Sequence, residues 1–88
     1  MRKLSTILEW GTLVRVVCTS CDATRDLRMP EIAALIEKVG PDYSLINRRC
    51  RCRLTPNCRG WNRFRYNGAG GMYPLWTEAQ EARWNAEP

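Results

Sequence analysis

The sequence predicts a small α+β domain that is stabilised by a bound metal ion. The chain has 88 residues, enough for one small domain with a thin apolar core, and natural domains of this size often add a cross-link or a metal. One amphipathic helical pattern lies between short β-branched and aromatic runs, which indicates mixed secondary structure. Five cysteines are present, and their odd number argues against a closed set of disulfides. Clustered cysteines then favour metal binding over cross-linking.

The expected compartment is the cytoplasm, where thiols stay reduced. Residues 1–17 do not form a convincing secretory signal, because Glu9, Trp10 and Arg15 interrupt any apolar stretch. No run of the sequence approaches the apolar length that spans a bilayer. We therefore expect no membrane partner.

The first part of the chain predicts two strands joined by a tight turn. Residues 1–10 are compatible with either a short strand or a helical turn. Residues 12–17 are β-branched and apolar, which predicts a strand that leads directly into Cys18-Thr-Ser-Cys21. We expect residues 22–28 to return as a second strand.

The clearest helix spans residues 30–39. Pro30 suits the first helical position, and Gly40 followed by Pro41 ends the helix. Four apolar residues follow the spacing of one buried helical face, namely Ile32, Leu35, Ile36 and Val39. This face predicts packing against the core.

The second part predicts two further strands and a short terminal helix. We expect strands at residues 48–54 and 61–66, with turn residues between them, and a flexible turn or linker at residues 67–71. Thr77 with Gln80 three residues later marks the start of a helix that extends to about residue 85. Such a short helix needs a surface on which to dock.

Four of the five cysteines have the arrangement of a thiolate metal site. Zn²⁺ in structural sites takes four tetrahedral ligands, and histidine is absent from the chain. Spacing selects Cys18 and Cys21, and no neighbouring cysteine replaces Cys58. The fourth ligand is Cys50 or Cys52, and Cys52 is favoured because it lies closer to the turn that Cys58 closes. Cys50 is then expected to be a small buried hydrophobe. The alternative for all of these cysteines is that they are buried thiols without a metal.

Three features resemble the zinc-ribbon class, namely the VCTSC turn, a helical insertion, and CRCRLTPNC followed by an aromatic strand. In that class two cysteine knuckles lie at the tips of antiparallel β-hairpins. The second half is similar to the four-cysteine fingers at the C-terminus of bacterial type I topoisomerases, and the element order resembles small zinc-ribbon-like proteins of bacteria and their phages. The resemblance covers residues 12–66 and implies one structural Zn²⁺ on Cys18, Cys21, Cys52 and Cys58. The chain departs from a minimal ribbon in the thirty residues between Cys21 and Cys52.

The resulting domain organisation has two parts. Residues 1–71 are expected to form a zinc-ribbon domain with an inserted helix. Residues 72–88 are expected to form an aromatic segment and a short docking helix.

The excess positive charge is concentrated in one segment, since residues 44–77 contain seven arginines and no acidic residue. Alternation along residues 61–66 puts Trp61, Arg63 and Arg65 on one face, and pairing with residues 48–54 creates two rows of like charge that repel. A nucleic acid, with DNA favoured, relieves this repulsion because arginine binds phosphate and aromatic rings stack on bases. The predicted contact residues are Arg49, Arg51, Arg53, Arg59, Trp61, Arg63 and Arg65. The alternative is a solvated face, or one neutralised by acidic residues of segment 22–37 or of the terminal helix.

A protein-interaction adaptor or inhibitor that docks on an acidic partner is the second hypothesis. Aromatic residues and methionine are enriched at interface cores, and the candidate docking residues are Met72, Tyr73, Leu75, Trp76 and Trp84. The alternative is that these side chains cover the domain's own core.

An enzyme is not expected. No histidine is available as a base or as a ligand of an open site, and a four-thiolate zinc has no free position for water. We therefore expect no small-molecule substrate.

Overall fold

The computed structural model describes residues 3–86, so Met1, Arg2, Glu87 and Pro88 lie outside the described residues. The elements in chain order are α1 (Leu4–Trp10), β1 (Val14–Cys18), β2 (Thr24–Leu27), α2 (Met29–Val39), β3 (Cys50–Arg51), β4 (Trp61–Gly68), β5 (Gly71–Pro74) and α3 (Glu78–Ala86). This is a small α+β fold. None of the helices within the described range has the length and apolar character that crossing a membrane requires.

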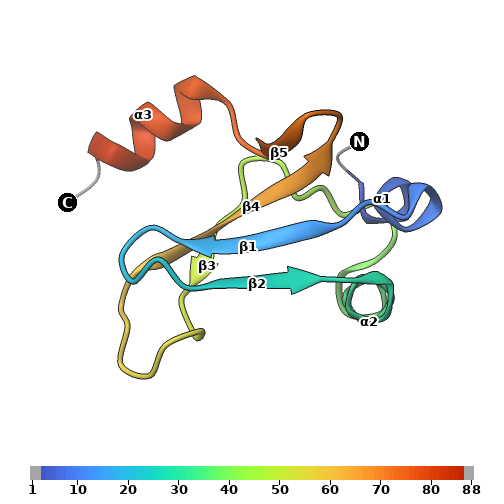
Figure 1. The fold of residues 1–88 in the computed structure, drawn as a ribbon, viewed down its shortest axis with the longest axis horizontal. Helices are drawn as coiled ribbons and strands as arrows, with labels where there is room; N and C mark the ends of the chain where they lie inside the picture. The colour runs from blue at the N-terminus through green and yellow to red at the C-terminus, as the bar shows by residue number, and fades with distance from the viewer. Residues whose placement is uncertain (1–2, 87–88) are drawn as a thin grey trace.

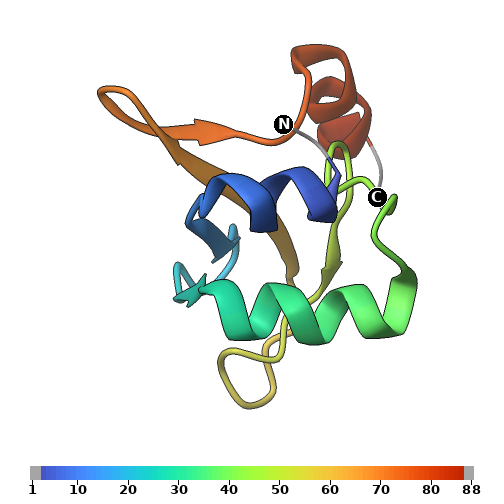
Figure 2. The same cartoon turned by 90° about the vertical axis from the view of Figure 1, so that its right-hand side faces the viewer.

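One antiparallel sheet organises the molecule, with strand order β2-β1-β4-β3 and β5 paired to β4 (Figure 1). The turn between β1 and β2 and the connection between β3 and β4 lie at one end of the sheet (Figure 1). Helices α1 and α2 lie together at the other end (Figure 2). The polar, cysteine-bearing end is therefore separate from the helical end.

The two faces of the sheet differ because directly paired residues project to the same side. Val16 pairs with Phe64, and Cys18 pairs with Asn62; we call this side the inner face. Val17 pairs with Arg63, and Arg15 pairs with Arg65; we call that side the outer face. The apolar core lies on the inner face at the helical end and consists of Leu4, Ile7, Val14, Ile32, Leu45 and Leu75.

Residues 1–10 form a helix in their described part, which settles the open alternative. Leu4 and Ile7 are one turn apart and fully buried in the core. Gly11 ends α1 in the left-handed conformation at φ 66°, and its N–H bonds back to the carbonyl oxygen of Ile7. Burial against distant residues, which no local pattern shows, makes this short segment helical.

Helix α2 confirms the predicted helix but not its full apolar face. Ile32 is buried, whereas Leu35 and Ile36 are only partly buried. Val39 is 42% exposed, so its prediction as a core residue is wrong. The helix ends there at Gly40, beyond the edge of the small core.

One strand prediction needs correction, and one open alternative is settled. The strand expected at residues 48–54 has only two residues, Cys50–Arg51, because the chain then bends so that Cys52 joins the cysteine cluster. At residues 67–71, predicted as a turn or a linker, the turn alternative holds, because these residues end a hairpin in which Gly68 pairs with Gly71. Gly70 and Gly71 have φ values of 89° and 143°, which a tight turn requires and glycine permits.

The terminal segment is tied to the body of the protein through Asn47 and Leu75. The backbone N–H of Asn47 donates to the carbonyl oxygen of Leu75 at 2.8 Å, and the N–H of Thr77 donates to Asn47 Oδ1 at 2.9 Å. The predicted cap is present, since the N–H of Gln80 donates to Thr77 Oγ1 at 3.1 Å. Helix α3 therefore begins at a defined position beside the sheet.

Candidate functional site

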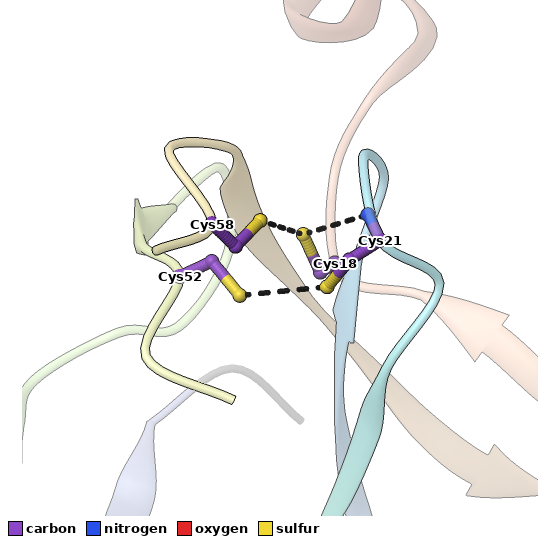
Figure 3. Close-up of side chains that lie close together, drawn as sticks. All are labelled: Cys18, Cys21, Cys52 and Cys58. Atoms are coloured by element: carbon purple, nitrogen blue, oxygen red, sulfur yellow. Dashed lines mark hydrogen bonds between the residues drawn. The ribbon is translucent and has the colours of Figure 1, made fainter. Parts of the chain in front are cut away.

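Four cysteine sulfur atoms form a compact cluster at the end of the sheet away from α1 and α2. They belong to Cys18, Cys21, Cys52 and Cys58 and all lie within 4.8 Å of one another. The Sγ atoms of Cys18 and Cys58 are 3.7 Å apart, and those of Cys21 and Cys52 are 3.8 Å apart (Figure 3). Four Zn–S bonds of about 2.3 Å in a tetrahedron require edges of about 3.8 Å. The cluster therefore has the dimensions of a tetrahedral thiolate metal site.

The sheet brings the two cysteine pairs together. Cys18 ends β1 and Cys21 lies in the turn that follows, while Cys52 follows β3 and Cys58 precedes β4. Because β1 pairs with β4, with Cys18 opposite Asn62, the two turns meet at the same end of the sheet. Figure 3 shows the two cysteines of one turn facing the two cysteines of the other.

Backbone and hydroxyl donors surround the sulfur atoms. The N–H groups of Ser20 and Cys21 point to Cys18 Sγ at 3.4 and 3.5 Å, and the N–H of Gly60 points to Cys58 Sγ at 3.4 Å. The hydroxyl of Thr55 donates to Cys21 Sγ at 3.2 Å. Such donors stabilise thiolates and orient them as ligands.

The protonation of the cluster favours a bound cation. The hydrogen bond from Thr55, together with the backbone N–H of Ala23, lowers the pKa of Cys21 to about 6 despite desolvation. At Cys58 the backbone N–H of Gly60 favours the thiolate, but desolvation and the three neighbouring thiols outweigh it and raise the pKa to about 12. Four thiolates so close together repel, so a divalent cation is needed for all of them to be deprotonated at neutral pH. The donor set therefore fits a metal.

Gly60 and Thr55 are site residues that sequence reasoning missed. A Cβ on Gly60 would lie 2.5 Å from Ser20 Cβ and 3.1 Å from Cys18 Sγ, so only glycine allows the two turns to approach so closely. The sequence signal is a glycine two residues after Cys58, where the backbone N–H meets the sulfur. Thr55 lies in the stretch between two predicted strands where the sequence pattern indicates only a turn.

Cys50 does not join the cluster. The prediction that it is a buried hydrophobe is wrong, because the residue is exposed. It pairs with Asn62 and lines a surface hollow of about 510 Å³ on the inner face, together with Arg25, Arg53 and other side chains. Partial desolvation of the thiol raises the pKa of Cys50. The sulfur cluster thus contains Cys52 rather than Cys50, as the spacing favoured.

The predicted row of arginines on β4 is present but covered. The guanidinium carbon of Arg63 lies 5.4 Å from the ring centre of Trp76 and 4.8 Å from that of Trp84, and Arg65 lies 5.0 Å from Trp76. Arg63 is also 3.5 Å from Glu81, and its side chain is only 11% exposed. The expectation of an open arginine row is therefore wrong for Arg63, which the C-terminal helix neutralises.

Arg49, Arg51 and Trp61 extend this stacked arrangement along the outer face. Arg49 lies 4.3 Å from the ring centre of Trp61 and 5.4 Å from that of Trp84. Arg51 lies 4.1 Å from Trp61 and donates to the carbonyl oxygen of Arg59 at 3.1 Å. Three tryptophans and four arginines thus form one connected group, which we call the arginine–tryptophan network: Arg49, Arg51, Trp61, Arg63, Arg65, Trp76 and Trp84.

A second group of arginines remains open beside the cysteine turns. Arg53 and Arg59 flank the cysteines of the second turn, and Arg25 shares the inner-face hollow with Arg53. All three residues are exposed. Within residues 3–86, none of them forms an ion pair with a carboxylate. By contrast, Arg15 on β1 binds Asp26 at 2.7 Å and lowers the pKa of that carboxyl group.

The predicted docking residues lie mainly within the protein's own packing. Leu75 belongs to the apolar core, and Trp84 is buried on the arginine–tryptophan network. Met72 and Trp76 are partly buried, while Tyr73 is 41% exposed and packs beside Tyr66. The alternative that this segment covers its own domain therefore holds for Leu75 and Trp84.

Comparison of the chain with protein-family models, curated proteins and solved structures finds no match. The four-cysteine cluster is compatible with a zinc-ribbon-like site, and it suggests a structural metal site on geometry alone.

Proposed function

We propose that this protein is a zinc-ribbon-like, non-enzymatic nucleic-acid-binding module of the cytoplasm, with DNA as the favoured ligand. One structural Zn²⁺ is bound by Cys18, Cys21, Cys52 and Cys58. The metal holds the two turns rigid, and the arginines beside them contact phosphate. The observation that carries the proposal is the open group of Arg25, Arg53 and Arg59, which has no carboxylate partner within the described residues.

The choice of metal follows from the donor set. Four thiolates at tetrahedral spacing suit Zn²⁺ and also suit iron, whereas the hard cations Mg²⁺ and Ca²⁺ prefer oxygen ligands. Zinc is the proposed metal because it binds such closed sites without redox chemistry. Metal analysis of the purified protein distinguishes the two, and a stoichiometry of one iron per chain would contradict the zinc assignment.

The open arginines have the chemistry that phosphate recognition needs. A guanidinium donates two parallel hydrogen bonds to a phosphate and keeps its charge at all physiological pH values. Arg53 and Arg59 lie in the turn that carries Cys52 and Cys58, so a metal there would fix the backbone from which they project. Both belong to residues 44–77, which contain no acid that competes for them.

Fluorescence anisotropy of the zinc-loaded protein with labelled single-stranded and duplex DNA and RNA tests the proposal. The logarithm of the affinity should fall linearly with the logarithm of the salt concentration. The double variant Arg53→Ala/Arg59→Ala should lower the magnitude of the slope by about 2, because each arginine that binds a phosphate accounts for roughly one unit of it.

The matched control is Lys38→Ala/Arg83→Ala, which removes two exposed positive charges from the helices α2 and α3. Its salt slope should stay close to that of the wild type. Absence of binding at low salt would overturn nucleic-acid binding, and an equal loss in both double variants would overturn its location beside the cysteine turns.

A further inference from the structure

Helix α3 contacts the outer face of β4 through aromatic rings and a carboxylate. The ring centres of Trp76 and Trp84 are 6.4 Å apart, and both rings lie close to the guanidinium of Arg63. Glu81 Oε1 is 3.5 Å from Arg63 Nη1, and its second oxygen accepts a hydrogen bond from the indole of Trp76 at 3.3 Å. Arg63 is thus held by two rings and one anion from the C-terminal segment.

These are the two kinds of group that a single-stranded nucleic acid offers to a protein. Its bases present flat aromatic faces, and its phosphates present oxygen anions, which arginine binds by stacking and by hydrogen bonds. Trp76 and Trp84 offer Arg63 and Arg65 the kind of ring that a base would offer, and Glu81 offers Arg63 the kind of anion that a phosphate would offer. The C-terminal segment therefore supplies an internal equivalent of a bound strand.

The contact between α3 and β4 has few interactions that hold it in place. Among residues 3–86 the backbone of α3 lies close to no other helix or strand, so long side chains alone bridge the gap to the sheet. In Figure 1, α3 stands away from the strands at the end of the chain. A helix of nine residues is marginal without tertiary support, and the Glu81 side chain of the ion pair is 44% exposed, so solvent weakens the pair.

The docked helix also leaves one donor of Arg63 unused. Arg63 Nε is buried and has no hydrogen-bond partner within the described residues. A buried unpaired donor is unfavourable. A phosphate oxygen, which accepts several hydrogen bonds, is a better partner for a guanidinium than a carboxylate that is shared with Trp76.

We propose that the outer face of β4, with Arg63 and Arg65, is a binding surface for single-stranded nucleic acid, and that α3 covers it until a strand displaces the helix. This inference rests on the proposed function and extends it. The exposed Arg51 and Arg59 connect the open arginines at the cysteine turns to this surface, since the Arg51 side chain both contacts Trp61 and reaches Arg59. A single strand is favoured over a duplex because stacking requires unpaired bases.

The test compares two charge-neutralising variants on the same helix. Glu81→Gln weakens the contact with Arg63, whereas Glu78→Gln removes the same charge from an exposed residue that pairs with no cation within the described range. Fluorescence anisotropy measures the affinity of each variant for a labelled oligothymidylate and for a labelled duplex of equal length. We expect Glu81→Gln to bind the oligothymidylate about fivefold more tightly than Glu78→Gln, with a smaller difference for the duplex.

NMR spectra and amide hydrogen exchange report directly on whether α3 leaves the sheet. In the zinc-bound wild type, addition of oligothymidylate should move the indole N–H resonances of Trp76 and Trp84, and it should speed amide exchange in α3. Trp84→Ala removes a ring that contacts Arg63 and should also bind the oligothymidylate more tightly. Thermal unfolding of this variant shows whether the rest of the protein remains folded.

The outcomes separate the two proposals. If Arg53→Ala/Arg59→Ala weakens binding while Glu81→Gln and Glu78→Gln bind equally and the indole signals stay fixed, the role of α3 is overturned and the proposed function stands. If the wild type and Glu78→Gln fail to bind but Glu81→Gln binds, the covering role of α3 is supported, and the proposal that the open arginines bind nucleic acid in the wild type is overturned. If no variant binds any nucleic acid, both are overturned.

Discussion

Gly60 lies where the second cysteine turn packs directly against Ser20 of the first. Its φ is not in the left-handed region, so the requirement for glycine is one of space and not of backbone conformation. Thr55 lies beside the cysteine cluster, and Cys50 lies outside it. Thr55 donates to a ligand sulfur, and Cys50 pairs with Asn62 outside the cluster.

Gly60→Ala should destabilise the zinc-bound protein by about 1–3 kcal/mol, the usual cost of forcing extra volume into a packed site. The new methyl group would collide with both side-chain atoms of Ser20. Chemical denaturation with zinc present measures the change in stability. The double variant Gly60→Ala/Ser20→Gly removes the colliding atoms and should recover most of the stability; failure to recover would show that another contact is responsible.

Thr55→Val should weaken zinc binding at neutral pH by roughly tenfold, a typical effect of removing a residue that supports a ligand. Without the hydroxyl, the pKa of Cys21 rises from about 6 toward the ordinary thiol value, so protons compete better with the metal. The difference from wild type should therefore shrink as pH rises above about 8.5. Competition with a chromophoric chelator at several pH values measures this, and Thr24→Val, an exposed change on β2, is the control. An equal affinity of wild type and Thr55→Val at pH 7 would refute the prediction.

Cys50→Ser should retain one zinc per chain, whereas Cys52→Ser should lose it or bind it far more weakly. The two residues are two positions apart and the chemical change is the same, but only Cys52 Sγ lies in the cluster. Metal analysis after gel filtration is sufficient. Loss of zinc from Cys50→Ser would show that the fifth thiol is a ligand.

At the scale of elements, β4 joins the separate parts of the fold. Its inner face packs Phe64 and Tyr66 against the core, and its outer face presents Arg63 and Arg65 to the C-terminal segment. The strand pairs with β1, β3 and β5. Helix α3 is the opposite kind of element, since it is held at its start by a cap and along its length only by side chains.

Thr77→Ala should destabilise α3 by about 1 kcal/mol, the usual cost of removing a helix cap. We expect amide exchange in residues 80–86 to become about fivefold faster, while the unfolding midpoint of the sheet changes little. Gln80→Ala is the control, because the bond to Thr77 comes from the backbone N–H of Gln80 and survives the loss of its side chain. Equal acceleration in both variants would mean that the cap does not stabilise the helix.

At the scale of the whole molecule, the turns that carry the four-cysteine cluster lie at one end of the sheet and helices α1 and α2 at the other (Figures 1 and 2). The core has six buried residues, and a core in a domain of this size supplies only about 3–5 kcal/mol. The cysteine end contains no comparable apolar cluster among the described residues. A metal held by the four cysteines, as proposed, would link residues 18–21 to residues 52–58 and be the main stabilising contact of that end.

Removal of the metal by a strong chelator should unfold the protein, because structural zinc contributes on the order of 10 kcal/mol in small domains. Circular dichroism and tryptophan fluorescence follow the transition, and addition of zinc should reverse it. Acid should act in the same direction, because protons displace the metal from thiolates as pH falls. A metal-free protein with the spectrum of the loaded form would contradict a structural role for the site.

The sequence alone predicts those parts of the fold whose determining residues are close together in the chain. The spacing of apolar residues predicts α2, alternation predicts the two faces of β4, and Thr77 predicts the start of α3. The four-sulfur set also follows from spacing, since one cysteine pair lies in each of two turns. For the helices and the strand, neighbouring residues carry the energetic preference, so the sequence is sufficient; the two cysteine pairs meet because β1 pairs with β4.

Contacts between residues far apart in the sequence determine the other parts of the fold. Residues 4–10 are helical because Leu4 and Ile7 are buried against distant segments, and β3 stops after two residues because Cys52 turns toward the other cysteines. The cover over Arg63 depends on Glu81, which is distant in sequence and adjacent in space. Charge and periodicity predict which side chains a strand presents, but only the path of the folded chain determines which of them remain open to a partner.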